Sequence, residues 1–176
     1  MANTWDDILV ERLRYYIFDL DSSNYSWTDL QLQKFLAISS IDVLSDLTKY
    51  DVGGPYSIDT SISGPEMITP DLVANAPAIV TNLVTVRAAC LISQQEYRRL
   101  LAQGAGWKVT DDRSTIDGSN ALNASKDQAN YYCTAYTNML VDFKTNNQYG
   151  GSAILSPYSK DGFPPTIGGC NNGLSH

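Results

Sequence analysis

The longest regular pattern in the sequence runs from Pro77 to Gln103 and predicts one long helix. The residues of its main face recur at alternating spacings of four and three, as one side of a helix requires. This face comprises Ile79, Leu83, Val86, Cys90, Ser93, Tyr97 and Leu100. The opposite face is apolar as far as Ile92 and polar beyond it. We therefore expect a scaffold helix that is buried in its first half, amphipathic in its second, and ended by Gly104.

Three further stretches have helical periodicity. Thr4 is a candidate N-cap for a helix from Trp5 to Ile17, with Asp6 and Asp7 in its first turn. Thr28 and Gln31 form a capping-box pattern before a second helix that ends near Leu47. Its broad apolar face contains Phe35, Leu36, Ile38, Ile41, Val43, Leu44 and Leu47. A fourth helix is predicted from Ala124 to Lys144, packing through Tyr132, Ala135, Tyr136, Met139, Leu140 and Phe143.

Extended structure is predicted in two places between these helices. The stretch from Tyr56 to Ile62 half-alternates, so it is either one short edge strand or an extended crossing, and residues 67–71 lead in extended form to the long helix. After Gly104 and Gly106, residues 107–110 and 114–116 predict a β-hairpin with its turn at 111–113. The expected fold is therefore mainly α: a bundle of about four helices with a small β-hairpin near 107–116.

The composition changes at Gly150, which divides the chain into a helical domain of residues 1–149 and an extended C-terminal arm of residues 150–176. The arm is rich in Gly, Pro, Ser and Asn and cannot form a core of its own. It is either a disordered tail or an arm that folds on a partner. We favour the second, because apolar residues are spaced through it at Ile154, Leu155, Tyr158, Phe163 and Ile167.

Charge and composition limit the classes of partner. The net charge is −7, which argues against binding nucleic acid through its phosphates but not against an acidic passage through which DNA slides. Charged residues are only 18% of the chain, and there are eleven tyrosines. Such a surface suits packing against other proteins. With no apolar run of 18 residues and no leader pattern, we expect no membrane span and a reducing, cytosol-like compartment.

Residues suited to catalysis or metal binding are few. The single histidine is the last residue, His176, so Ser/His and Cys/His pairs are effectively excluded. Cys90, Cys133 and Cys170 are odd in number and widely spaced, which predicts neither a zinc site nor a disulfide framework. Cys90 is expected to be a small core residue. We predict no catalytic residues, no cofactor and no metal.

Two polar segments have a possible binding role and a simpler structural one. Residues 19–24 begin like a calcium loop but have Asn24 where glycine is needed and Leu30 where a glutamate is needed, so we expect a polar turn. Arg98 and Arg99 are the densest basic spot. We expect them to complement the helix dipole or to form a rim salt bridge rather than to bind phosphate.

The order of these features resembles a known family. The segments ERLRYYIFDLDSSNYSWTDLQLQKFL, AISSIDVLSDL, ITPDL and NLVTVRAACLISQQEYRRLL, within residues 5–103, resemble the head–tail connector adaptor (head-completion) proteins of tailed bacteriophages. The resemblance implies a non-enzymatic homo-oligomeric ring, dodecameric in that family. Such a ring docks on the portal protein beneath the head, contacts tail or neck proteins, and passes DNA through its centre without binding it specifically. It would be assembled in the host bacterial cytoplasm and located in the virion at the head–tail interface.

The residues expected to contact partners are Arg98 and Arg99 at the rim, and Ile154, Leu155, Tyr158, Phe163 and Ile167 in a portal-facing arm. Three alternatives remain open. One is another neck component, such as a stopper or tail-completion protein. Another is a helical module that captures a peptide between its helices. The third, an enzyme of unrecognised type, is the one the lack of histidine favours least.

Overall fold

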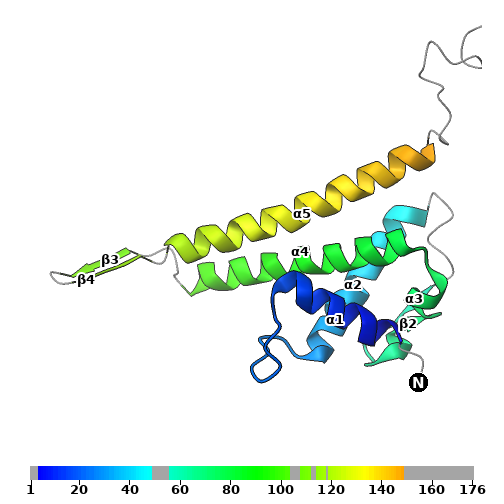
Figure 1. Cartoon of the computed structure of the whole chain (residues 1–176), viewed down its shortest axis with the longest axis horizontal. Coiled ribbons are helices and arrows are strands. Elements are labelled where there is room, and N and C mark those ends of the chain that lie inside the picture. Colours follow the sequence, from blue (N-terminus) through cyan, green and yellow to red (C-terminus); the bar gives the residue numbers. More distant parts are fainter. Residues whose placement is uncertain (1–3, 49–55, 104–107, 112–113, 118, 149–176) are drawn as a thin grey trace, which may run out of the picture. The chain divides into compact units, whose positions relative to one another are not determined.

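The structure is a computed structural model that describes residues 4–48, 56–103, 108–111, 114–117 and 119–148 (Figure 1). Most of the described residues are helical, and a two-stranded antiparallel hairpin is present, which confirms the mainly α fold with a small hairpin. The chain divides into two compact units, residues 1–139 and 140–176. All contacts described below lie within the first unit. The described part of the second is the C-terminal end of a helix, and the expected arm of residues 150–176 lies outside the described residues.

The first two helices have the predicted bounds, α1 over Trp5–Ile17 and α2 over Asp29–Leu47. The capping box before α2 is present, with the Gln31 N–H donating to the Thr28 hydroxyl at 3.3 Å and the Thr28 N–H donating to the Gln31 side chain at 2.9 Å. Thr4 occupies the N-cap position of α1, but its side chain makes no capping bond. Its hydroxyl donates instead to Asp6 and Asp7, so the expected role for the Thr4 side chain is wrong.

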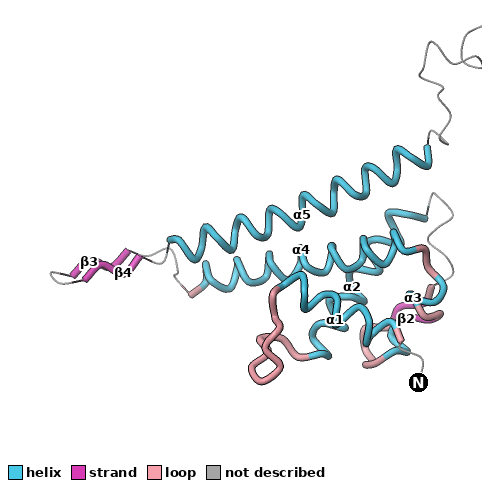
Figure 2. The backbone as a smooth tube through the Cα atoms, in the orientation of Figure 1, coloured by secondary structure: helices cyan, strands magenta, loops and turns pink. Residues whose placement is uncertain are grey.

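The described residues between α2 and the long helix, 56–77, form a compact connection that we call the crossing (Figure 2). It comprises strand β1 (Ser57–Ile58), the short 3-10 helix η2 (Pro65–Met67), strand β2 (Ile68–Thr69) and the one-turn helix α3 (Leu72–Asn75). β1 pairs antiparallel with β2, Ser57 opposite Thr69 and Ile58 opposite Ile68. Of the two readings of this stretch, the short strand is therefore the one adopted.

Helix α4 spans Ala78–Ala102 and lies against α1 and α2. From Val80 to Ser93 it is buried on most sides, and its last two turns expose Arg98, Arg99 and Leu101. The predicted change from a buried to an amphipathic half is confirmed. The largest side chains buried around this helix come from α1, α2 and the crossing: Trp5, Leu9, Leu13, Leu32, Leu36, Leu47, Met67, Ile68 and Leu72. Burial at about 25 cal/mol per Å² of apolar surface is the main force that holds these helices together.

The β-hairpin and the last helix also form as expected. Strands β3 (Lys108–Asp111) and β4 (Ser114–Asp117) pair antiparallel, with Val109 opposite Ile116. Helix α5 spans Ser119–Gln148, longer at both ends than the predicted 124–144. The additional residues include Asn120, Asn123 and Asn146, which have weak helix propensity. They are still helical because extending a helix that has already nucleated costs less free energy than starting one.

A disulfide bond joins Cys90 of α4 to Cys133 of α5, with their Cα atoms 4.9 Å apart. The expectation that the cysteines would not pair is therefore wrong. Cys90 is fully buried, as a small core residue should be. What spacing could not indicate is that the fold brings Cys133 of α5 against Cys90, 43 residues earlier in the chain. The bond fixes α5 covalently to the rest of the bundle.

Candidate protein-interaction surfaces

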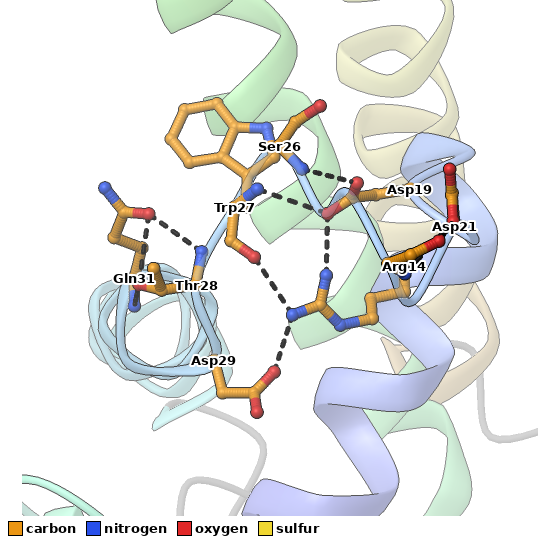
Figure 3. Close-up of polar contacts among 9 residues, drawn as sticks. Arg14, Asp19, Asp21, Ser26, Trp27, Thr28, Asp29 and Gln31 are labelled. Carbon is orange, nitrogen blue, oxygen red and sulfur yellow. Dashed lines mark hydrogen bonds and ion pairs between the residues drawn. The ribbon is translucent and has the colours of Figure 1, made fainter.

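A buried arginine organises the turn between α1 and α2 (Figure 3). The Arg14 guanidinium donates to Asp19 and Asp29, each at 2.6 Å, and to the Trp27 carbonyl oxygen at 3.0 Å. The Arg14 and Asp19 side chains are only 7% and 6% exposed. Asp19 also accepts the N–H groups of Ser26 at 2.8 Å and Trp27 at 3.3 Å. The predicted polar turn is confirmed. It is stabilised by the buried ion pair of Arg14 and Asp19, and both side chains make further hydrogen bonds within the turn.

Phe18 ends α1 in a conformation that is unfavourable for its residue type. Its backbone is left-handed, with φ 59° and ψ 28°. This conformation lets the Asp19 N–H reach the Arg14 carbonyl oxygen at 3.0 Å, but glycine is the usual residue there. For a residue with a Cβ it costs about 1 kcal/mol. The Phe18 side chain is also 78% exposed, so the isolated chain gains little burial in return.

An open groove of about 660 Å³ lies between the C-terminal end of α1 and the first half of α5. We call it the aromatic groove. The Tyr132 hydroxyl donates to the Tyr16 carbonyl oxygen, and the two rings meet edge to face with centroids 6.2 Å apart. Burial raises the pKa of the Tyr132 hydroxyl above the ordinary tyrosine value of about 10, which extends the pH range over which this hydroxyl can donate. The groove is lined by Tyr15, Tyr16, Phe18, Asp127, Gln128, Tyr131 and Tyr132.

Three aromatic rings of the groove face solvent: Tyr15 is 61% exposed, Phe18 78% and Tyr131 69%. Each exposed tyrosine is followed in the sequence by one that packs inward, Tyr16 or Tyr132. Neighbouring residues point about 100° apart on a helix, so here, where α1 and α5 are covered on one side only, the second tyrosine of each pair packs inward and the first faces solvent. The sequence patterns did not single out the three exposed rings as a surface. For Tyr15 and Tyr131, the repeated Tyr-Tyr pair was the signal that could have found them.

A second apolar surface runs along the outer face of α2. We call it the α2 stripe: Leu30, Lys34, Ile38, Ile41 and Ser45, spaced by three and four and all exposed. Leu30, Ile38 and Ile41 are 43%, 44% and 47% exposed. Ile38 and Ile41 were expected to belong to the packing face of this helix. The bundle instead buries the other side, through Leu36, Ala37, Val43, Leu44 and Leu47.

The position of α5 is fixed by polar contacts as well as by the disulfide. The Tyr136 hydroxyl donates to Asp46 at 2.9 Å, and the Arg87 guanidinium lies 5.2 Å from the Tyr136 ring centroid. Arg87 is itself paired with Asp42 at 2.8 Å. Burial, followed by the hydrogen bond to Asp46, raises the pKa of Tyr136 far above its usual value. The aromatic groove is therefore built on helices that are already held together.

The predicted partner-contact residues fall in two places. Arg99 pairs with Glu96 of the same helix through bonds of 3.0 and 2.5 Å, and Arg98 is exposed beside it. This pair has the form of the expected salt bridge. Arg99 also lines a second cavity, of about 580 Å³, together with Phe18 and Trp27. The arm residues Ile154, Leu155, Tyr158, Phe163 and Ile167 lie outside the described residues.

Within the described ranges, no group of three or more His, Cys, Asp or Glu side chains is arranged to hold a metal ion. None of the helices described has the length and apolar character needed to cross a bilayer.

Comparison with protein-family models, curated proteins and solved structures finds no match to this chain.

Proposed function

We propose that this protein is a structural adaptor of a tailed-bacteriophage virion: a homo-oligomeric ring between portal and tail that passes DNA through its centre. The observation that carries the proposal is the aromatic groove. Exposed tyrosine and phenylalanine rings on ordered helices are typical of surfaces that bind protein, because they offer large contact area at little cost in side-chain entropy. The resemblance of residues 5–103 to connector adaptors is the reason for proposing this particular assembly.

Two further features support a place in a virion. Disulfides persist at virion surfaces and are uncommon in a reducing cytoplasm, so the bond between Cys90 and Cys133 suits a particle that leaves the cell. The net charge of −7 suits a channel wall that must not retain DNA. In this proposal the chain is not an enzyme. Arg98 and Arg99 contact neighbours at the rim, and Ile154, Leu155, Tyr158, Phe163 and Ile167 form the portal-facing arm.

A second candidate is a helical peptide-binding module. It is favoured by the same groove, since an apolar groove between two helices is a common way to hold an amphipathic helix. This function needs no ring and no portal. Another neck component, such as a stopper or tail-completion protein, would be a ring that does not stack on portal.

Electron microscopy of the full-length protein, with and without purified portal, separates these functions. Closed rings that stack on portal are the expected result. A stable monomer that ignores portal would overturn the proposal and favour the peptide-binding module.

The arm is tested by comparing two variants with the full chain. One lacks residues 150–176. The other keeps the full length but replaces its five apolar arm residues by serine. Both should lose portal docking and keep the helical circular dichroism signal. Docking that survives both changes would exclude the arm as the contact.

A further inference from the structure

The geometry points to a specific contact between copies: the α2 stripe of one copy docks in the aromatic groove of the next. This inference deepens the proposed ring by naming its interface, and it rests on that proposal. It requires that the two surfaces be separate, complementary and available on every copy.

The two surfaces are separate and differ in shape. The stripe lies wholly on α2, whereas the groove is formed by α1 and α5, and they share no residue. The stripe is a ridge of side chains from Leu30 to Ser45, about 22 Å long at 1.5 Å per residue. The groove is concave, with aromatic walls and a volume of about 660 Å³. Branched aliphatic side chains such as Ile38 and Ile41 are suited to fill the space between such rings.

The charges at the two surfaces are opposite. The stripe carries one charged residue, Lys34, flanked one turn away on each side by Leu30 and Ile38. The groove also carries one, Asp127. Lys34 and Asp127 are both exposed, and neither forms an ion pair with any residue that the structure describes. Each of these opposite charges is surrounded by apolar groups. Such a pair determines the orientation and register of a contact more than it raises the affinity.

The conformation of Phe18 gives independent support. A phenylalanine in left-handed backbone with an exposed ring is unfavourable in an isolated subunit. Both disadvantages are offset if the ring is buried by a neighbour, because burying an aromatic side chain stabilises by roughly 2 kcal/mol. Phe18 lies in the lining of the groove, where the stripe of a neighbour would cover it.

A contact of this kind is heterologous, since it joins two different surfaces. After one contact forms, each of the two copies still has one surface free, and copies are added until the rotation closes a ring. A stripe-to-stripe contact would instead stop at a dimer. The two arrangements respond differently to charge reversal, which gives a direct test.

The test uses full-length Lys34→Glu and Asp127→Lys, alone and mixed, with assembly on portal measured by sedimentation and electron microscopy. In Lys34→Glu the stripe and the groove are both negative, and in Asp127→Lys both are positive. Each variant alone should assemble at least about tenfold more weakly than the wild type. An equimolar mixture should recover assembly, because every stripe then meets a groove of opposite charge in alternating copies.

Controls separate the interface from folding. Lys126→Glu makes the same charge change on an exposed α5 residue that does not line the groove, and it should assemble like the wild type. Lys34→Gln and Asp127→Asn remove the charges without reversing them and should show intermediate losses. Circular dichroism checks that every variant keeps its helices.

The outcomes are distinct. If wild-type rings form on portal but the charge reversals have no effect, or if mixing fails to restore assembly, this interface is wrong while the adaptor function stands. If the assembly defect of Lys34→Glu is not relieved when Asp127→Lys is added, the stripe does not pair with the groove. If the wild type stays monomeric with portal present, both proposals fall.

Discussion

The Asp71 carboxylate accepts the backbone N–H of Trp5 at 2.8 Å, although 66 residues separate them. Its other oxygen accepts the N–H groups of Val73 and Ala74, at 2.8 and 2.9 Å. One side chain therefore caps both α1 and α3. The Trp5 indole N–H also donates to the Pro65 carbonyl oxygen at 2.7 Å, in the same crossing. These bonds fix the start of α1 to the segment that leads into α4.

Replacing Asp71 by alanine should lower the free energy of unfolding by about 2 to 3 kcal/mol. The change removes the caps of two helices at once, and a single lost cap typically costs about 1 kcal/mol. Urea denaturation measures the loss. Asp59→Ala is the matched control, because among the described residues the exposed Asp59 carboxylate accepts bonds from Ser61 alone, and its loss should have no measurable effect on stability. Equal losses in the two variants would contradict the capping role of Asp71.

Replacing Arg14 by alanine should lower the free energy of unfolding by about 3 to 5 kcal/mol. The cost arises because the Asp19 carboxylate would remain buried without its cation. Arg14→Lys should recover only part of the loss, since an ammonium group cannot reproduce the forked contacts to Asp19 and Asp29. Denaturant unfolding is the measurement, with the exposed Arg98→Ala, expected within about 0.5 kcal/mol of wild type, as control. A loss in Arg14→Ala as small as in the control would mean that the pair contributes no stability.

The stability of the fold should decrease at alkaline pH through Tyr136. Its pKa is raised in the folded chain, so above the ordinary tyrosine pKa of about 10 the unfolded chain loses the proton first. The unfolded state then binds fewer protons than the folded one, and the free energy of unfolding falls as pH rises. Below that range the contribution is complete and independent of pH.

Tyr136→Phe should therefore reduce the slope of stability against pH between about 9.5 and 11, while lowering stability at pH 7 by about 1 kcal/mol through loss of the bond to Asp46. Unfolding curves at a series of pH values measure both effects. Tyr131→Phe, which removes an exposed hydroxyl from the same helix, is the control. An unchanged alkaline slope in Tyr136→Phe would show that this hydroxyl is not responsible.

Reduction of the disulfide should destabilise the attachment of α5. In a Cys170→Ser background, a thiol reagent should find no reactive group in the denatured protein until a reductant is added, and two afterwards. Cys133→Ser should lower the free energy of unfolding by roughly 2 to 4 kcal/mol. Reductant should lower the unfolding midpoint of the wild type and leave that of Cys133→Ser unchanged. Two reactive thiols before reduction would contradict the crosslink.

Phe18→Gly should have opposite effects on folding and on assembly. Glycine adopts the left-handed backbone freely, so stability should hold or rise by up to about 1 kcal/mol. Assembly on portal should weaken, because the exposed ring is lost. Phe18→Ala is the paired control: it also removes the ring but keeps the unfavourable backbone, so it should weaken assembly with no gain in stability. Full assembly by both variants would exclude Phe18 from the contact.

Local signals predicted the helices well. The bounds of α1 and α2 were predicted correctly from residues near their ends, and the capping box of Thr28 and Gln31 formed as predicted, although the Thr4 side chain does not cap α1. Periodicity also predicted the buried and amphipathic halves of α4. It could not decide how much of a broad apolar face the bundle would cover, which is why Ile38 and Ile41 were wrongly assigned to the core.

What the sequence could not reveal depends on segments far apart in the chain. The Asp71 cap of α1, the Cys90–Cys133 bond and the aromatic groove each need the return of a distant segment, and no spacing rule encodes that return. Asp19 shows the same limit on a smaller scale. Its segment was correctly read as a turn, but only the fold shows that its carboxylate points inward to Arg14.

The bond between Cys90 and Cys133 also determines what a single cleavage of the backbone does to this protein. It closes the backbone from the middle of α4 to the middle of α5 into a covalent circle that includes both strands of the hairpin. A protease that cleaves once inside the circle opens it without releasing either half. New chain ends could therefore be placed in the hairpin, or a second domain inserted there, with α5 still attached to the bundle.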